Sequence, residues 1–272
     1  MISSTVPENF TAKILVEGHC SAAELLHQNT QLSKACLKDA MHKGAVWMTR
    51  EGVTKRIRRA KAAVQRGDQI VLYFNPAVLN APPPRAVLLD DQRHFSLWYK
   101  PAGLMCSGTR YGDHHSIARL VQTELNRPTF LVHRLDRFTR GVMVLAHSKR
   151  LAGKLSQQFA NRQTVKEYQA KVWGEFTSQV TIQDPIAGRD AISHVTAIET
   201  NQISIVSVRI ETGRKHQIRR HLASLGFPIV GDRMYGRQDG DDLQLVATRL
   251  QFQNPETSAL CDTQLPEKFR LA

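Results

Sequence analysis

The chain has 272 residues, of which 42% are hydrophobic and 22% are charged, a composition typical of folded globular proteins. Its 37 Lys and Arg residues outnumber its 24 Asp and Glu residues, and the net charge of +13 favours a polyanionic partner, either nucleic acid or an acidic membrane surface. No stretch approaches the roughly 18 consecutive apolar residues of a membrane span. The N-terminus also lacks the basic and apolar segments of a signal peptide, so we expect a soluble, cytoplasmic protein.

The spacing of the cysteines and histidines argues against a disulfide-rich protein and against a metal-binding one. The four cysteines lie far apart and form no CxxC motif, which argues against a disulfide framework and against a cysteine-rich zinc site. The 11 histidines form no HExxH motif or other recognised ligand spacing. We therefore expect no bound metal. A metal-dependent nuclease or phosphoesterase would need clusters of acids or histidines that the sequence does not contain.

Three consecutive prolines, Pro82 to Pro84, mark the clearest boundary. They interrupt both helices and central strands, so the segment predicts a stiff, extended connector. We expect an N-terminal domain at residues 1–80, a linker at 81–86 and a larger domain at 87–272.

The N-terminal region predicts two helices followed by strands. Ser21 and Glu24 form a capping box at the start of a short helix, and Ser33 caps a second helix that ends at Gly44. A Gly-Asp turn at 67–68 separates the two predicted strands, 45–48 and 70–74.

The same region is strongly basic, with ten Lys or Arg and only two acids between Ser33 and Arg66. The order of helices, glycine, strand, basic stretch, Gly-Asp turn and strand resembles the small αL RNA-binding domain of ribosomal protein S-four and of several tRNA-modifying enzymes. The usual Asn-Gly after the first strand is replaced here by the residues Thr49 to Gly52. A basic face that merely contacts solvent is the alternative. The resemblance implies an RNA-binding role for six residues: Lys34, Lys38, Lys55, Arg56, Arg58 and Arg59.

Residues after the linker alternate strand-like runs with turns and two amphipathic helices. This pattern predicts an α+β fold with a large mixed, mainly antiparallel sheet and flanking helices. The predicted helices are 151–159 and 216–225, and the predicted strands are 95–99, 142–146, 167–173, 193–199, 204–210 and 243–252.

Three segments of this region combine polar groups in unusual ways. In His133-Arg-Leu-Asp-Arg-Phe-Thr-Arg-Gly141, arginines surround Asp136 directly before an apolar strand, and nearby cations keep a carboxylate ionised, as a nucleophile or base requires. Tyr168, in Lys166-Glu-Tyr-Gln-Ala170, is a candidate stacking platform for a base. The segment 211–222, with the sequence ETGRKHQIRRHL, opens a basic helix whose N-terminus suits phosphate or carboxylate. Taken singly, the three also fit an ordinary ion pair, core packing and a basic surface helix.

Together with the YKPAG segment at 99–103, these motifs resemble the RluA-type RNA pseudouridine synthases over residues 95–255. The resemblance implies the pseudouridine synthase fold, an isomerase that converts specific uridines of structured RNA to pseudouridine, and no cofactor. It makes Asp136 the catalytic carboxylate and Tyr168 the residue that stacks beside the target uracil. Arg219 is then expected to form an ion pair with Asp136. The remaining implied substrate-binding residues are His133, Arg134, Thr212, Gly213 and Arg214.

Two departures from the family pattern stand out. Arg140 replaces the usual serine between Thr139 and Gly141, and a late Leu-His-Ala string is Leu-Val-Ala at 245–247. We expect large-subunit ribosomal RNA as the target, with tRNA as the alternative, and a monomer without an obligatory protein partner. A non-catalytic RNA-binding or ribosome-assembly protein is the competing hypothesis. The sequence leaves open whether the Asp attacks the sugar as a nucleophile or removes a proton from it.

Overall fold

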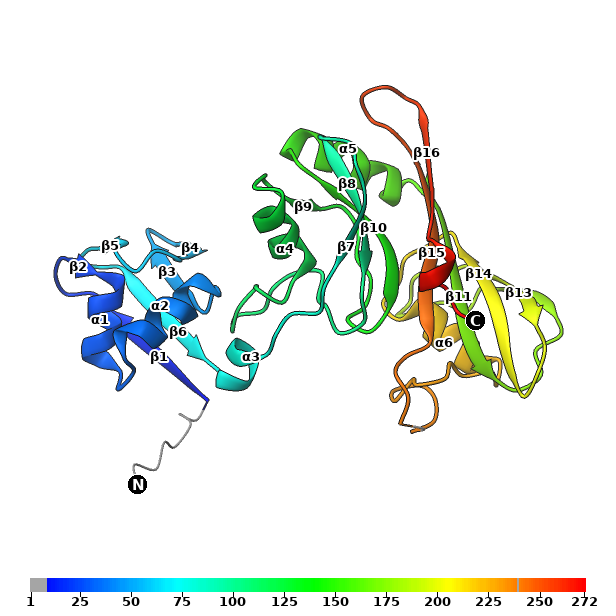
Figure 1. The fold of residues 1–272 in the computed structure, drawn as a ribbon, viewed down its shortest axis with the longest axis horizontal. Coiled ribbons are helices and arrows are strands. Elements are labelled where there is room, and N and C mark those ends of the chain that lie inside the picture. Colours follow the sequence, from blue (N-terminus) through cyan, green and yellow to red (C-terminus); the bar gives the residue numbers. More distant parts are fainter. Residues whose placement is uncertain (1–8, 239) are drawn as a thin grey trace. The chain divides into compact units, whose positions relative to one another are not determined.

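The computed structural model describes residues 9–238 and 240–272, and the chain divides into two compact units (Figure 1). The smaller unit comprises Met1–Pro83 and Ser107–Leu120, and the larger comprises Pro84–Cys106 and Val121–Ala272. Residues 107–120, which the sequence analysis placed in the second domain, therefore pack with the first. The first eight residues, where a signal peptide would begin, lie outside the described part of the chain. None of the described helices is both long and apolar enough to span a bilayer.

A four-stranded antiparallel sheet with the order β1-β6-β3-β4 forms the centre of the smaller unit. Buried and half-buried residues alternate along β6, so one face of the sheet packs on the apolar side chains of two helices, among them Leu26, Leu37 and Met41. The elements of this unit are β1 (Phe10–Leu15), β2 (Cys20–Ser21), α1 (Ala22–Asn29), α2 (Lys34–His42), β3 (Val46–Arg50), β4 (Val53–Arg56), β5 (Ala63–Val64), β6 (Gln69–Phe74) and α3 (Pro76–Asn80). The start of α4 (Ile117–Glu124) also belongs to it.

Helices α1 and α2 begin at the serines that the sequence predicts as their caps. The hydroxyl oxygens of Ser21 and Ser33 each accept a hydrogen bond from the backbone N–H three residues later, at 3.2 Å. These bonds satisfy N–H groups that have no partner within the helix. After α2 the chain turns at Gly44, whose φ of 84° is readily adopted by glycine but strains other residues.

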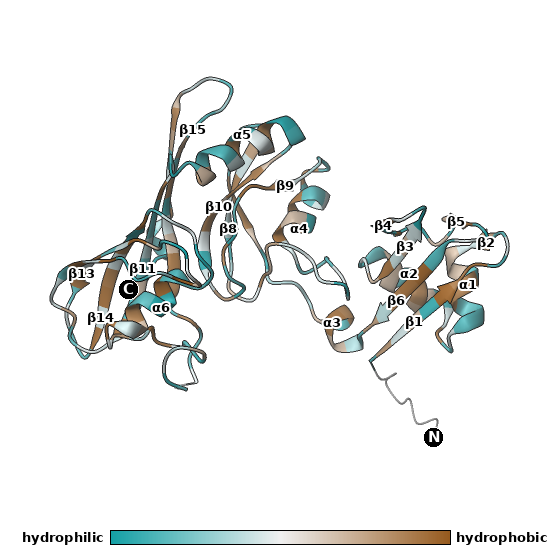
Figure 2. Ribbon diagram, turned by 180° about the vertical axis from the view of Figure 1, so that it is seen from behind, coloured by the Kyte–Doolittle hydropathy of each residue, from teal (hydrophilic) through white to brown (hydrophobic). Residues whose placement is uncertain are grey.

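The larger unit is built on a mixed, mainly antiparallel sheet of ten strands, which confirms the α+β prediction. Its main path runs β12-β13-β14-β11-β15-β10-β8-β7, with β16 pairing on β15 and β9 on β10. Figure 2 shows hydrophobic residues along β8 and β10 and polar ones on the outer face of α5. The strands are β7 (Val87–Asp91), β8 (Phe95–Lys100), β9 (Phe130–Leu131), β10 (Arg140–Ala146), β11 (Val165–Trp173), β12 (Gln179–Ile182), β13 (Ser193–Glu199), β14 (Ile203–Ile210), β15 (Leu245–Gln253) and β16 (Leu260–Gln264). The helices are α5 (Lys149–Ala160), α6 (Gln217–Ser224) and a 3-10 turn at Glu267–Phe269.

One junction in this sheet positions the candidate site. Strands β10 and β15 form the sheet's parallel pair, which is short and aligns Gly141 with Ala247. A Cβ on Gly141 would overlap the backbone of Ala247, and the φ of 127° at Gly141 also favours glycine. Tyr168 on β11 faces the same Ala247 from the other side of β15. The loop that precedes β10, which carries Asp136, is thereby brought next to Tyr168.

Candidate active site

A cavity of about 840 Å³ in the larger unit collects six of the eight catalytic and substrate-binding residues that the sequence predicted. Its walls come from the loop before β10, from β11, from the start of α6 and from two loops that precede β15. Of the predicted residues, six line it: Arg134, Asp136, Tyr168, Gly213, Arg214 and Arg219.

The backbone beside Asp136 is fixed by buried groups from β8 and the loop after it. Lys100 is fully buried, and its Nζ donates hydrogen bonds to the carbonyls of Leu104, at 2.8 Å, and Arg137, at 3.1 Å. Burial lowers the pKa of Lys100 to about 8, partly opposed by the negative charge of Asp136. The Cys106 thiol donates to the carbonyl of Leu135 at 3.1 Å, and its Sγ accepts the backbone N–H of Leu135 at 3.3 Å. The carboxylate of Asp136, with 26% of its side chain exposed, is thus held on a rigid loop that opens into the cavity.

Tyr168 is 8% exposed and lines the cavity. Burial raises the pKa of Tyr168, and the nearby carboxylate of Asp136 raises it further. The hydroxyl therefore stays protonated at neutral pH, and the residue contributes an uncharged aromatic face beside the carboxylate.

The predicted ion pair between Arg219 and Asp136 is replaced in the structure by a pair with Asp232. The Nε and one terminal nitrogen of Arg219 each donate to a different oxygen of Asp232, at 2.7 Å. The side chain of Asp232 has no exposed surface, and its Oδ1 also accepts the backbone N–H groups of Met234 and Tyr235. Burial of Asp232 raises its pKa, but the bonds from Arg219 and the two amides outweigh burial and lower it. Because an unpaired buried carboxylate is strongly destabilising, Arg219 pairs with Asp232.

Among the described residues, the titratable side chain in contact with the Asp136 carboxylate is instead His216, with its Nε2 3.8 Å from Oδ1. The Nδ1 of His216 lies 3.0 Å from the hydroxyl of Tyr235. The sequence carries no signal for this contact between His216 and Tyr235, because it depends on how the loop after Gly231 folds back over α6.

Two of the other predicted residues contribute to packing rather than lining the cavity. The Nε2 of His133 accepts the backbone N–H of Val144 at 3.1 Å, and the imidazole stacks on Phe159. Burial lowers the pKa of His133 to about 3, so the ring is neutral. The Thr212 hydroxyl is buried and donates to Gln217 Oε1 at 2.8 Å. His133 and Thr212 therefore stabilise the loops around the cavity without lining it.

Comparisons with known proteins show the family of this chain. The family model described as RNA pseudouridylate synthase matches residues 94–224. The dual-specificity RNA pseudouridine synthase RluA of Vibrio vulnificus is 31% identical over 212 residues, which cover 68% of this chain and 85% of the relative. The chain belongs to the RluA-type RNA pseudouridine synthase family.

Other relatives of this pseudouridine synthase support the assignment. The uncharacterized RNA pseudouridine synthase YhcT of Bacillus subtilis is 29% identical and covers 86% of this chain and 85% of the relative. The ribosomal large subunit pseudouridine synthase D of Xylella fastidiosa is 31% identical, covering 65% of this chain and 61% of the relative. The solved structure of human RNA pseudouridylate synthase domain containing 1 shares the fold, with a TM-score of 0.59 at 22% identity over 70% of this chain and 87% of that one.

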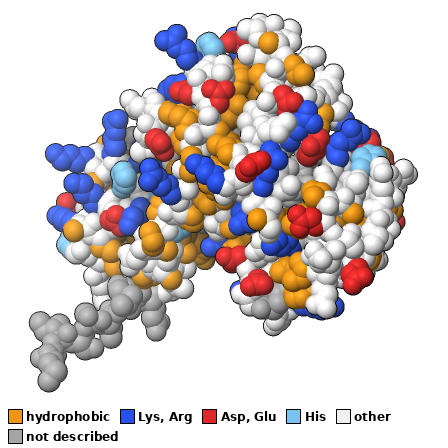
Figure 3. Space-filling view, turned by 45° about the vertical axis from the view of Figure 1, so that its right-hand side comes forward, with side chains coloured by type: hydrophobic (Ala, Val, Ile, Leu, Met, Phe, Trp, Pro, Cys, Tyr) orange, Lys and Arg blue, Asp and Glu red, His pale blue; other side chains and the backbone are white. Residues whose placement is uncertain are grey.

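In the smaller unit of this synthase, the residues predicted to bind RNA fall into two groups. Lys38, Lys55 and Arg59 have exposed side chains, and Figure 3 shows Lys and Arg side chains standing out at the left of the surface. Lys34 is also exposed and forms an ion pair with Glu24 at 3.2 Å.

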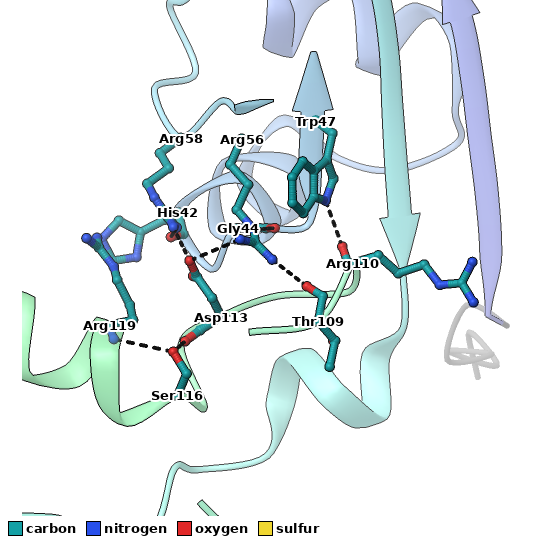
Figure 4. A network of polar contacts seen from close by, with 10 residues as sticks. All are labelled: His42, Gly44, Trp47, Arg56, Arg58, Thr109, Arg110, Asp113, Ser116 and Arg119. Carbon is teal, nitrogen blue, oxygen red and sulfur yellow. Dashed lines mark hydrogen bonds and ion pairs between the residues drawn. The ribbon is translucent and has the colours of Figure 1, made fainter. Parts of the chain in front are cut away.

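Arg56 and Arg58, by contrast, are engaged within the protein (Figure 4). Both guanidinium groups form ion pairs with Asp113, which is only 8% exposed. Arg56 also donates to the carbonyls of Gly44 and Thr109, at 2.9 and 2.6 Å. Arg56 and Arg58 therefore hold residues 107–120 against the rest of the unit. Their role in RNA binding stays a prediction.

Proposed function

We propose that Asp136 is the catalytic carboxylate of a uridine-to-pseudouridine isomerisation in structured RNA, and that Tyr168 stacks on the target uracil. The observation that carries the proposal is the placement of a partly exposed carboxylate and a buried phenol in one cavity of about 840 Å³. A cavity of that size accommodates a nucleotide, since ligand pockets typically measure about 300–1,000 Å³. A uridine must leave its stack to reach such a site, and aromatic contact offsets the few kcal/mol that unstacking costs.

The reaction breaks the bond from N1 of the uracil to C1′ of the ribose and forms a bond from C5 to the same C1′. Cleavage places positive character on the ribose, which a carboxylate stabilises as an ion or traps as a nucleophile. Removal of the adjacent sugar proton by Asp136 is the other route. The protonated Tyr168 supplies an apolar face without a competing charge.

Arg134 has an exposed side chain at the cavity, and Arg214 also lines it. We assign both to the RNA backbone, because guanidinium groups bind phosphate in a planar, two-pronged geometry. The exposed Lys38, Lys55 and Arg59 extend this role to the smaller unit, which we propose is an RNA-binding domain similar to that of ribosomal protein S-four.

Large-subunit ribosomal RNA is the proposed target. The name of the Xylella fastidiosa relative and the additional basic unit at residues 1–83 support it, and tRNA is the second candidate. Pseudouridine mapping across total RNA from cells with and without this gene tests the assignment. Loss of a site in tRNA alone would contradict it.

Replacement Asp136→Asn tests the catalytic role, because it keeps the shape of the side chain and removes its charge and nucleophilic oxygen. We expect pseudouridine formation below detection in single-turnover assays, with RNA affinity within about threefold of the wild type. The matched control is Asp184→Asn, which changes an exposed carboxylate away from the cavity and should keep full activity. Substantial turnover by the Asp136 variant would show that another group is the catalytic carboxylate.

A further inference from the structure

His216 is held in a strained conformation at the wall of the cavity. Its φ of 56° and ψ of 28° place it in the left-handed region, immediately before α6, and its side chain makes no capping hydrogen bond to the helix. Such a conformation is uncommon for a residue other than glycine and often occurs at functional sites. His216 is one of the residues that line the cavity.

Both nitrogens of this imidazole face groups of the site. Nδ1 lies 3.0 Å from the hydroxyl of Tyr235, and Nε2 lies 3.8 Å from Oδ1 of Asp136. Tyr235 is itself fixed, since its backbone N–H donates to Asp232 and its ring lies against the guanidinium of Arg219, 5.1 Å from the ring centroid. When Nδ1–H donates to the Tyr235 oxygen, the lone pair of Nε2 points toward Asp136.

Isomerisation to pseudouridine requires a base in addition to the carboxylate at the sugar. Once C5 is bonded to C1′, C5 still carries its hydrogen, which must leave to restore the aromatic uracil. With C1′ placed at the carboxylate of Asp136, C5 lies one bond and its hydrogen two bonds from that carbon, in the part of the cavity that His216 also lines. Tyr168 is unsuited to the task, because burial raises the pKa of its hydroxyl.

Burial, more than the charges around it, favours the neutral form of His216. Burial lowers its pKa, and the cations Arg219 and Lys215 lower it further, whereas the carboxylates of Asp136 and Asp232 act in the opposite sense. It is also the one histidine that lines the cavity in the part of the chain that the structure describes. A neutral imidazole next to a carboxylate that stabilises its protonated form is well suited to act as a general base.

We propose that Nε2 of His216 removes the C5 proton in the last step of the reaction, an inference that rests on the proposed role of Asp136. The C5–H bond breaks and its electron pair forms the C5=C6 bond. The pair of the N1=C6 bond moves to N1, which takes a proton from water. The imidazolium then returns its proton to water, so the isomerisation is balanced. Tyr235 is a positioning residue that holds the required tautomer.

Replacement His216→Asn tests the proposal, because asparagine adopts the left-handed conformation readily but is not a base. We expect single-turnover conversion of a uridine RNA to slow by about 100-fold or more. A deuterium at C5 of the target uridine should then slow the variant several-fold further. RNA carrying 5-fluorouridine has no C5 proton to lose. The variant should rearrange this RNA at a rate within about threefold of the rate of the wild-type enzyme on the same RNA.

The controls separate this role from its alternatives. The control Arg220→Ala changes an exposed residue of the same helix. It should leave the conversion rates of RNA with uridine, C5-deuterated uridine and 5-fluorouridine unchanged. Tyr235→Phe should give an intermediate defect on uridine alone. Asp136→Asn should block both uridine and 5-fluorouridine, so turnover by that variant would refute the proposed function instead. Equal slowing of uridine and 5-fluorouridine by His216→Asn, or a wild-type rate on uridine, would overturn the role of His216 as the base.

Discussion

Replacing Arg219 with alanine removes the cation from Asp232, a carboxylate whose side chain has no exposed surface. The guanidinium is also largely enclosed, with 11% of its side chain exposed, and both hydrogen bonds measure 2.7 Å. Leaving one member of such a buried pair typically costs about 3–5 kcal/mol of unfolding free energy. We therefore expect Arg219→Ala to destabilise the larger unit by roughly that amount. Arg219→Lys should recover only part of it, because an ammonium group lacks the planar two-pronged geometry.

Two double-mutant cycles identify the partner of this arginine. Combining Arg219→Ala with Asp232→Asn should give a coupling energy of about 2–3 kcal/mol, because either change alone already breaks the pair. Combining it with Asp136→Asn should give at most about 0.5 kcal/mol. The measurement is equilibrium urea unfolding at pH 7, followed through the transition of the larger unit. A larger coupling with Asp136 than with Asp232 would refute the pairing seen in the structure.

The same pair predicts how stability depends on pH. The pKa of Asp232 is lowered in the folded protein, so its contribution is complete above the ordinary carboxyl pKa of about 3.9. The contribution is lost as the pH falls through the lowered value. The Arg219→Ala variant should lose this part of the acid dependence, and an unchanged acid profile would contradict it.

Three further predictions concern other parts of the structure. Gly141→Ala should lower the free energy of unfolding by at least about 3 kcal/mol, since the added Cβ overlaps the backbone of β15. The control is Gly153→Ala in α5, where an added Cβ meets no atom within 4 Å. Thermal unfolding should show this control to be neutral or stabilised by up to about 1 kcal/mol. Asp113→Asn should destabilise the smaller unit by about 1–3 kcal/mol and speed hydrogen exchange in the β3–β4 hairpin, and unchanged exchange would argue against the role of the carboxylate. The double change Lys38→Glu and Lys55→Glu should reduce the salt dependence of RNA binding by about two released counterions, whereas an unchanged slope would exclude both lysines from the interface.

The sequence alone determined the features that depend on neighbouring residues. The starts of α1 and α2 were predictable because a capping serine acts on a backbone N–H only three residues away. Strand β13 was predicted with its observed bounds, and the mainly antiparallel α+β sheet followed from the series of such strands. The family motifs likewise predicted Asp136 and Tyr168, and both line the cavity.

Only the tertiary structure decided which charged groups meet. Arg219 lies within reach of more than one carboxylate, and the choice of Asp232 depends on the fold of the loop after Gly231, where burial leaves that carboxylate in need of a cation. From the sequence, Arg56 and Arg58 are expected to be surface cations. In the structure both form ion pairs with Asp113, which lies more than 50 positions further along the chain. Short-range patterns carry no information about such pairs. Their formation is governed by the desolvation of each charge in the folded chain, a quantity that exists only after distant segments have packed together.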